Sequence, residues 1–158
     1  MAVDVQSEIE IARPRVEVAA FASDPDNALA WYENIASVEW RTPRPVAVGA
    51  RFAFVAQFLG RRLSYTYEVR ELVPDERLVM STDEGPFLME MTYAWSDTAD
   101  GGNRMTLRNQ GPPPHQAASR DGLEPRVRAV QVIGAPGFER IRGASVRHFR
   151  CYSWSEVL

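Results

Sequence analysis

The chain has 158 residues, 45% of them hydrophobic and 25% charged, which is typical of a soluble globular protein built as one domain over residues 1–158. Its formal net charge of −3 at pH 7 argues against a nucleic-acid partner, because phosphate binding needs a concentrated basic surface. No segment approaches the roughly 18 apolar residues of a membrane span, no secretory signal is visible, and the single Cys151 cannot form an intramolecular disulfide, so we expect a cytoplasmic protein.

The first third of the chain predicts one strand followed by two short helices. Residues 3–11 alternate with period two, so that a mostly apolar set of side chains shares one face. Arg13-Pro14 ends this strand, and Pro14 suits the first residue of a helix in which apolar residues recur at helical spacing. The sequence Asp24-Pro25-Asp26-Asn27 breaks that helix and caps a second one over residues 28–34.

From Ile35 to Asn109 we expect an antiparallel sheet of six further strands. Turn sequences separate them, among them Gly60, Pro74-Asp75-Glu76 and Asp100-Gly101-Gly102-Asn103. The predicted strands cover residues 38–41, 51–59, 63–73, 78–82, 87–96 and 104–109.

The bulky side chains of these strands share one face of the sheet, because residues two apart in a strand point the same way. The aromatic and Met residues of this parity are Phe52, Phe54, Phe58, Tyr65, Tyr67, Phe87, Met89, Met91, Tyr93 and Trp95. The opposite parity carries residues that suit water, namely Arg51, Gln57, Ser64, Thr66, Glu68, Glu90 and Thr92. An apolar face needs a cover, and the space beneath it can hold a ligand; the alternative is a filled core.

The C-terminal segment, residues 111–158, is atypical because Pro and Gly interrupt every long window. An amphipathic stripe predicts a helix over about residues 137–152, and a strand over residues 146–153 is the alternative. The apolar Phe138, Phe149 and Trp154 fit a homodimer contact as well as a contact with the sheet.

Catalytic and cofactor motifs are scarce in this sequence. His115 and His148 are the only histidines, and neither has metal-ligand spacing to Cys or another His, so we expect no metal site. No nucleophile elbow, phosphate loop or dinucleotide fingerprint appears, so we expect no cofactor. Asn109 shares the inward parity of Met105 and Leu107. It therefore suits a hydrogen bond to a ligand carbonyl, or alternatively to the loop that follows.

The order of one strand, two short helices, six antiparallel strands and a C-terminal helix resembles the START-like helix-grip superfamily, also called SRPBCC. Within it, the chain resembles the polyketide cyclase/dehydrase branch over residues 3–110. The matching segments are residues 9–15 with Val16, Phe21, Ser23-Asp24-Pro25 and Trp31; Val48-Gly49-Ala50-Arg51-Phe52; Tyr67-Glu68-Val69 with Pro74, Arg77 and Leu78; and Gly101-Gly102-Asn103-Arg104-Met105-Thr106.

The resemblance implies an α+β helix-grip fold, in which a seven-stranded curved antiparallel sheet with two short helices after its first strand grips a C-terminal helix across an apolar cavity. The residues that it places on the cavity are Phe54, Phe58, Tyr65, Tyr67, Met80, Met89, Met91 and Tyr93, with Trp40 nearby and Trp31 near the mouth or beneath the short helices. The family usually ends in one long uninterrupted helix, from which the segment 111–158 departs.

We therefore expect the chain to bind a hydrophobic or aromatic small molecule, lipid-like or polyketide-like, between the sheet and the C-terminal helix. The alternative is a cyclase, aromatase or dehydratase that uses the same cavity, with Tyr65, Tyr67 and Tyr93 as candidate catalytic residues. A third hypothesis is a protein-interaction module, which needs an exposed apolar patch outside the concave face of the sheet.

Overall fold

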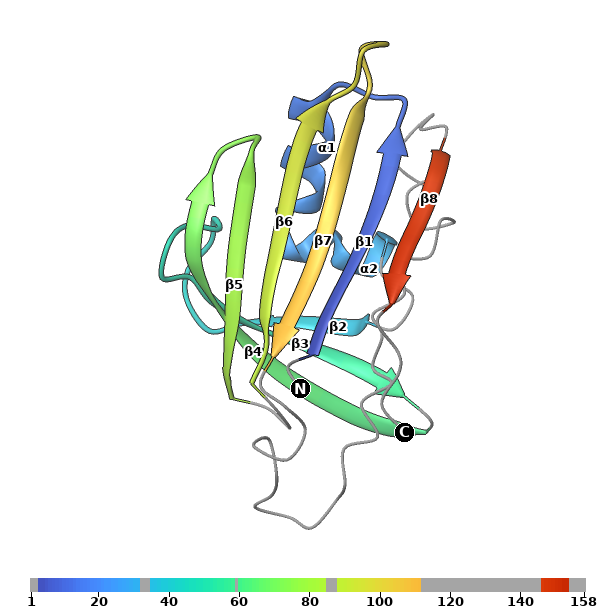
Figure 1. Cartoon of the computed structure of the whole chain (residues 1–158). Coiled ribbons are helices and arrows are strands. Elements are labelled where there is room, and N and C mark those ends of the chain that lie inside the picture. Colours follow the sequence, from blue (N-terminus) through green and yellow to red (C-terminus); the bar gives the residue numbers. More distant parts are fainter. Residues whose placement is uncertain (1–2, 32–34, 59, 85–87, 112–145, 154–158) are drawn as a thin grey trace.

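The computed structural model describes residues 3–31, 35–58, 60–84, 88–111 and 146–153 (Figure 1). Its helices are α1 (Arg15–Ala22), the 3-10 turn η1 (Pro25–Asn27) and α2 (Ala28–Trp31). Its strands are β1 (Val3–Ile11), β2 (Ile35–Trp40), β3 (Arg51–Phe58), β4 (Arg61–Val73), β5 (Arg77–Glu84), β6 (Glu90–Asp97), β7 (Asn103–Gly111) and β8 (Val146–Ser153).

The strands form one antiparallel sheet in the order β2-β3-β4-β5-β6-β7-β1-β8. Figure 1 shows this sheet curling, so that β2, β3 and one end of β4 run across the other strands. The register between β4 and β5 shifts at Thr66/Tyr67 and again at Val69/Glu71. Because such bulges bend a strand and increase its twist, they supply the curvature at this point. The seven predicted strands and their curvature are confirmed, and β8 adds an eighth strand to the sheet.

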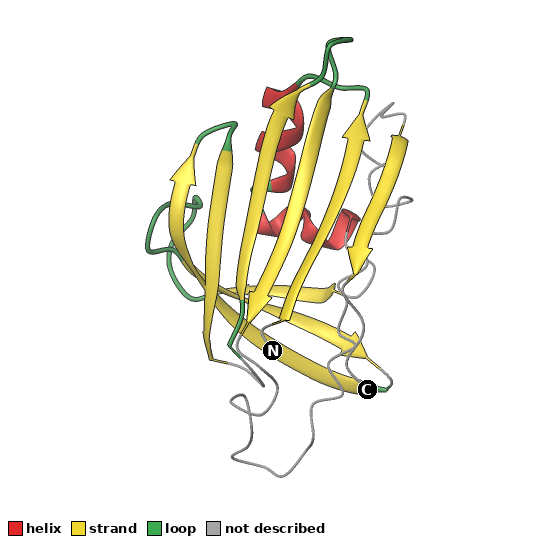
Figure 2. Ribbon diagram, viewed as in Figure 1, coloured by secondary structure: helices red, strands yellow, loops and turns green. Residues whose placement is uncertain are grey.

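The two short helices are also confirmed, and Figure 2 shows them on one side of the sheet. Helix α1 follows Pro14, whose extended backbone occupies the N-cap position, and it buries Val18, Ala19 and Ala22. The Asp24 side chain caps η1 by accepting a hydrogen bond of 3.0 Å from the Asp26 backbone N–H. The short segment from α1 to α2 therefore lies folded against the concave face.

The core lies between these helices and the concave face. Its largest fully buried side chains are Trp31, Tyr67, Tyr93, Phe52, Ile9, Ile11, Leu78, Met80, Met91, Met105 and Leu107. All strand members have the parity that the sequence assigned to the inner face. The outer face differs from expectation in one respect, because Thr66 is buried there together with Ala53, Val55 and Val79. Strand β4, which carries Thr66, pairs with β3 on one side and β5 on the other, so the neighbouring strands limit the access of water to this residue.

The C-terminal prediction requires a correction. Residues 146–153 form strand β8, which pairs with β1, so the predicted helix is wrong for these residues and the alternative strand is right. The remainder of that predicted helix, residues 137–145, lies outside the described residues. The physical reason is that the edge of β1 that does not face β7 offers this segment a ladder of backbone hydrogen bonds.

Candidate functional site

The concave face is built from rows of side chains that sit directly opposite one another on neighbouring strands. Phe52 faces Trp40 on one side and Tyr67 on the other, and Phe54 likewise lies opposite Tyr65. Directly paired residues share a face and bring their Cβ atoms close together. The rings accordingly touch, with centroid distances of 5.6 Å for Trp40–Phe52 and 5.2 Å for Phe52–Phe54. This part of the face is a continuous aromatic surface.

The helices add Trp31 to that surface. Its ring meets Tyr93 edge to face, with centroids 5.8 Å apart, and Tyr93 in turn meets Trp95 at 6.1 Å. Such edge-to-face pairs contribute about 0.5–1.5 kcal/mol beyond the area that they bury. Trp31 therefore fixes α2 to the centre of the sheet, at strand β6.

A pocket lies between the helical segment and the sheet, with an empty volume of about 190 Å³ that is partly open to solvent. It is lined by Ala22, Ser23, Pro25, Ala28, Trp31, Phe52, Phe54, Leu78, Met80 and Tyr93. Its enclosed part has room for about one water molecule. We call it the η1 pocket.

The structure brings four of the predicted ligand-binding residues together at the η1 pocket: Trp31, Phe54, Met80 and Tyr93. Four others, Tyr65, Tyr67, Met91 and Asn109, are buried elsewhere on the concave face, and Trp40 and Met89 are partly buried beside the core. The side chain of Phe58 lies outside the described residues. Sequence reasoning missed Phe52 and Leu78, which strand parity marks as inward. It also missed the small residues Ala22, Ser23, Pro25 and Ala28, which carry no comparable signal.

Few polar groups interrupt this face. The Thr82 hydroxyl is satisfied, since it accepts from the Met89 backbone N–H at 2.7 Å and donates to the Met89 carbonyl at 3.3 Å. Asn109 is different, because its buried Oδ1 has no hydrogen-bond partner among the described residues. Burial raises the pKa of the Tyr65 hydroxyl above its usual value, so that this group stays protonated at neutral pH.

Charged groups lie away from the concave face. Glu68 is ion-paired with Arg70 at 2.9 Å on the outer face, and Glu90 is exposed, as their parity predicted. Within the described part of the chain, no group of three or more His, Cys, Asp or Glu side chains is placed to hold a metal ion. No helix of that part is long and apolar enough to cross a membrane. The described large apolar residues that are exposed, such as Val16, Leu29 and Leu88, belong to separate elements of the chain.

A family model described as polyketide cyclase / dehydrase and lipid transport matches residues 2–144. A comparison with curated proteins found no match.

Solved structures share the fold at low sequence identity. A START superfamily protein from Mycobacterium smegmatis is 10% identical with a TM-score of 0.61, over 73% of this chain and 84% of that one. A major latex-like protein from Panax ginseng is 12% identical with a TM-score of 0.63, over 76% and 85%. The protein TTHA0849 from Thermus thermophilus is 22% identical with a TM-score of 0.59, over 67% and 71%. These likenesses bear on the fold alone.

Proposed function

Because the chain belongs to the polyketide cyclase/dehydrase and lipid transport family of START-like proteins, we propose that it binds a hydrophobic small molecule, lipid-like or polyketide-like, on the concave face of its sheet. The observation that carries this proposal is the continuous aromatic and Met surface that runs from Trp40 through Phe52 and Tyr67 to the η1 pocket. Met side chains adapt their shape to different apolar ligands, and Met80 and Met91 stand at the middle of the face.

The site extends beyond the η1 pocket in this proposal. A pocket for a small organic ligand has a volume of roughly 300–1,000 Å³, whereas the enclosed part of the η1 pocket has room for about one water molecule. In this proposal, a ligand of that size needs the helical segment to move away from the sheet, and it then reaches Tyr65, Tyr67, Met91 and Asn109, which are buried in this structure. These residues keep the roles expected from the sequence, in which apolar walls supply affinity and the hydroxyl and amide groups orient polar substituents.

The expected affinity follows from the apolar area. Burying roughly 300 Å² of ligand surface contributes about 7 kcal/mol before ordering costs, and a micromolar dissociation constant corresponds to about 8 kcal/mol. The apolar contacts therefore do not reach micromolar affinity by themselves. Hydrogen bonds of about 1 kcal/mol each add to the apolar contacts, and Asn109 and the Tyr hydroxyls are the groups in place to make them.

Substitutions at two neighbouring residues of β5 test whether a bound ligand lies on the concave face. Met80 lies on the concave face and Val79 on the outer face of the same strand, and both are buried. We expect Met80→Ala to shift the dissociation constant of an uncharged apolar dye at least about threefold, measured by fluorescence titration, since it changes the wall of the site. Val79→Ala is the matched control and should leave that constant unchanged. Equal constants in the wild type and both variants would place the dye elsewhere.

The second candidate function is a cyclase, aromatase or dehydratase that acts on a poly-β-keto chain in the same site. The observation that favours it is the burial of the Tyr65, Tyr67 and Tyr93 side chains on the concave face. The raised pKa of Tyr65 suits a proton donor better than a base. If single Tyr→Phe variants at these positions turn over a poly-β-keto analogue as fast as the wild type, these hydroxyls are not catalytic.

A further inference from the structure

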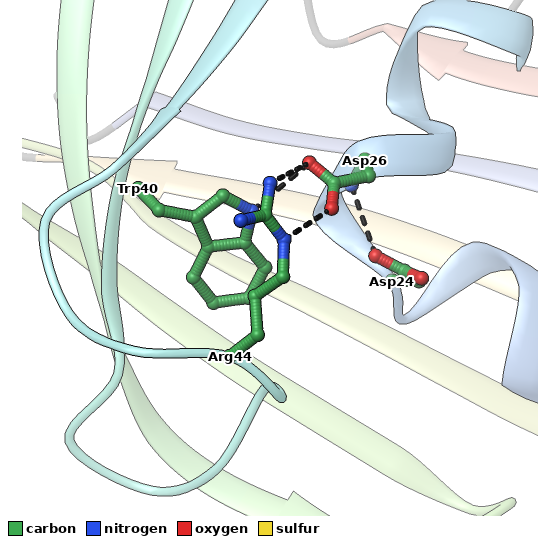
Figure 3. Close-up of polar contacts among 4 residues, drawn as sticks. All are labelled: Asp24, Asp26, Trp40 and Arg44. Atoms are coloured by element: carbon green, nitrogen blue, oxygen red, sulfur yellow. Dashed lines mark hydrogen bonds and ion pairs between the residues drawn. The ribbon is translucent and has the colours of Figure 1, made fainter.

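Side-chain contacts join the helical segment to β2 and to the loop that follows it, as Figure 3 shows. Asp26 lies in η1, Trp40 ends β2, and Arg44 lies in the loop between β2 and β3. We call them the rim cluster.

The rim cluster is held by contacts that converge on one carboxylate. Asp26 Oδ1 accepts a hydrogen bond of 2.9 Å from the Trp40 indole N–H and one of 3.2 Å from Arg44 Nη2. Asp26 Oδ2 accepts a hydrogen bond of 2.8 Å from Arg44 Nε, so the guanidinium binds the carboxylate with two nitrogens. The same guanidinium lies over the Trp40 ring, 5.1 Å from its centroid. The contacts support one another, because the Asp26 carboxylate and the Trp40 ring both hold the Arg44 guanidinium, and the carboxylate also holds the Trp40 ring.

Both sides of the rim cluster continue into the walls of the η1 pocket. Pro25, the residue before Asp26, lines the pocket on the helical side. Phe52 lines it on the sheet side, and the Trp40 ring packs on Phe52 with centroids 5.6 Å apart. The Asp24 cap on the Asp26 backbone holds η1 in the orientation that points the Asp26 carboxylate at the loop. The cluster therefore ties one wall of the pocket to the other at its edge.

We propose that the rim cluster is a latch on the route by which a hydrophobic ligand enters the η1 pocket. Asp26 must separate from Trp40 and Arg44 before η1 and α2 can move away from the β2–β3 loop. The side chains of Asp26 and Arg44 are 41% and 62% exposed, and exposed ion pairs are individually weak, so the latch opens readily. This inference rests on the proposed function, since a latch acts only if a ligand enters.

Exchange kinetics of a bound dye test the latch. Asp26→Ala removes all contacts of the Asp26 carboxylate at once, and Arg44→Gln removes the ion pair but keeps the bond from Trp40 to Asp26. We expect Asp26→Ala to raise both the association and the dissociation rate of an uncharged apolar dye by roughly threefold to tenfold in stopped-flow fluorescence, with a smaller rise for Arg44→Gln. The dissociation constant should stay within about twofold, because a latch that restrains entry and exit alike changes rates and not affinity.

Glu68→Ala is the matched control, because it breaks another exposed ion pair, with Arg70, on the outer face. It should leave both rates at the wild-type value, and raised salt should speed exchange in the wild type but not in Asp26→Ala. If the wild type binds the dye and Asp26→Ala exchanges it at the rate of Glu68→Ala, the latch is wrong and the binding function stands. If the wild type binds no apolar dye, the proposed function is wrong and the latch fails with it.

Discussion

Replacing Asn109 by Leu should stabilise the protein while it weakens the binding of ligands that carry a hydrogen-bond donor. Asn109 lies on the concave face of β7, opposite Met91, and only 9% of its surface is exposed. Its Oδ1 is buried and has no hydrogen-bond partner among the described residues. A buried acceptor without a partner costs stability, and under the proposed function its partner is a donor group on the ligand.

The size of the effect follows from the desolvation of that oxygen. An unsatisfied buried acceptor costs about 1–3 kcal/mol, and Leu replaces Asn with an apolar side chain of similar size. Some of the gain is offset by imperfect packing of the new methyl groups, which leaves a net stabilisation of about 1 kcal/mol. In a chain of this length, 1 kcal/mol raises the melting temperature by about 3 °C.

Urea denaturation measures this change in the free energy of unfolding. If the slope of that free energy against urea concentration is the same in wild type and variant, the substitution has not changed the compactness of the folded or the unfolded state. The matched control is Thr82→Val on the same face, which removes a hydroxyl with two hydrogen bonds to Met89 and should destabilise by about 1–3 kcal/mol. If Asn109→Leu also destabilises by more than about 1 kcal/mol, Asn109 has a structural partner such as the following loop, and its role as a ligand contact is refuted.

Three further predictions concern the fold and its charges. Hydrogen bonds from Arg44 and, second, from Trp40 lower the pKa of Asp26 below its ordinary value of 3.8. The ionised carboxylate therefore stabilises the fold above pH 3.8, and this stabilisation is lost as the pH falls through the lower pKa of the folded state. The difference in unfolding free energy between wild type and Asp26→Asn should accordingly vanish in acid. Phe52→Ala should cost about 3–5 kcal/mol in urea denaturation because the ring is fully buried, whereas Val16→Ala, at an exposed site on α1, should cost under about 0.5 kcal/mol. Gly102→Ala should lower the melting temperature by several degrees, since an added Cβ would lie 2.6 Å from the Ile11 carbonyl oxygen. An unchanged melting temperature would mean that the β1 backbone at Ile11 shifts at little cost in free energy.

Strand parity was enough to predict the concave face from the sequence. Phe52 and Phe54, like Tyr65 and Tyr67, are two residues apart in strands that are long enough for the period to be seen, and each is buried as parity requires. The outer face was harder to predict. Thr66 is polar but sits in the middle of the sheet, where the neighbouring strands and not its own chemistry determine exposure.

The C-terminal strand could not be decided from the sequence alone. In residues 146–153, Phe149 and Tyr152 satisfy a helical spacing of three, while Val146, Phe149 and Tyr152 are also residue types that strands favour. Local pattern leaves both open, and pairing with β1, more than a hundred residues away in the chain, selects the strand.

The small residues on the helical side of the η1 pocket, and the contacts that join Asp26 to Trp40 and Arg44, were missed for the same reason. Ala22 and Ala28 are small residues whose role depends on what lies opposite them. Asp26 was interpreted only as part of a helix break and cap, because an ion pair between a 3-10 turn and a loop residue 18 positions away has no local signature. Tertiary placement, not propensity, creates both features.

The most direct test of ligand binding is native mass spectrometry of the protein purified from its source organism, compared with the mass of the denatured chain. We expect the native mass to exceed the denatured mass by that of one small apolar molecule, which is lost on denaturation. The polypeptide mass alone, even after incubation with a lipid and phenolic extract of the same cells, would contradict the account and identify the concave face as a filled core.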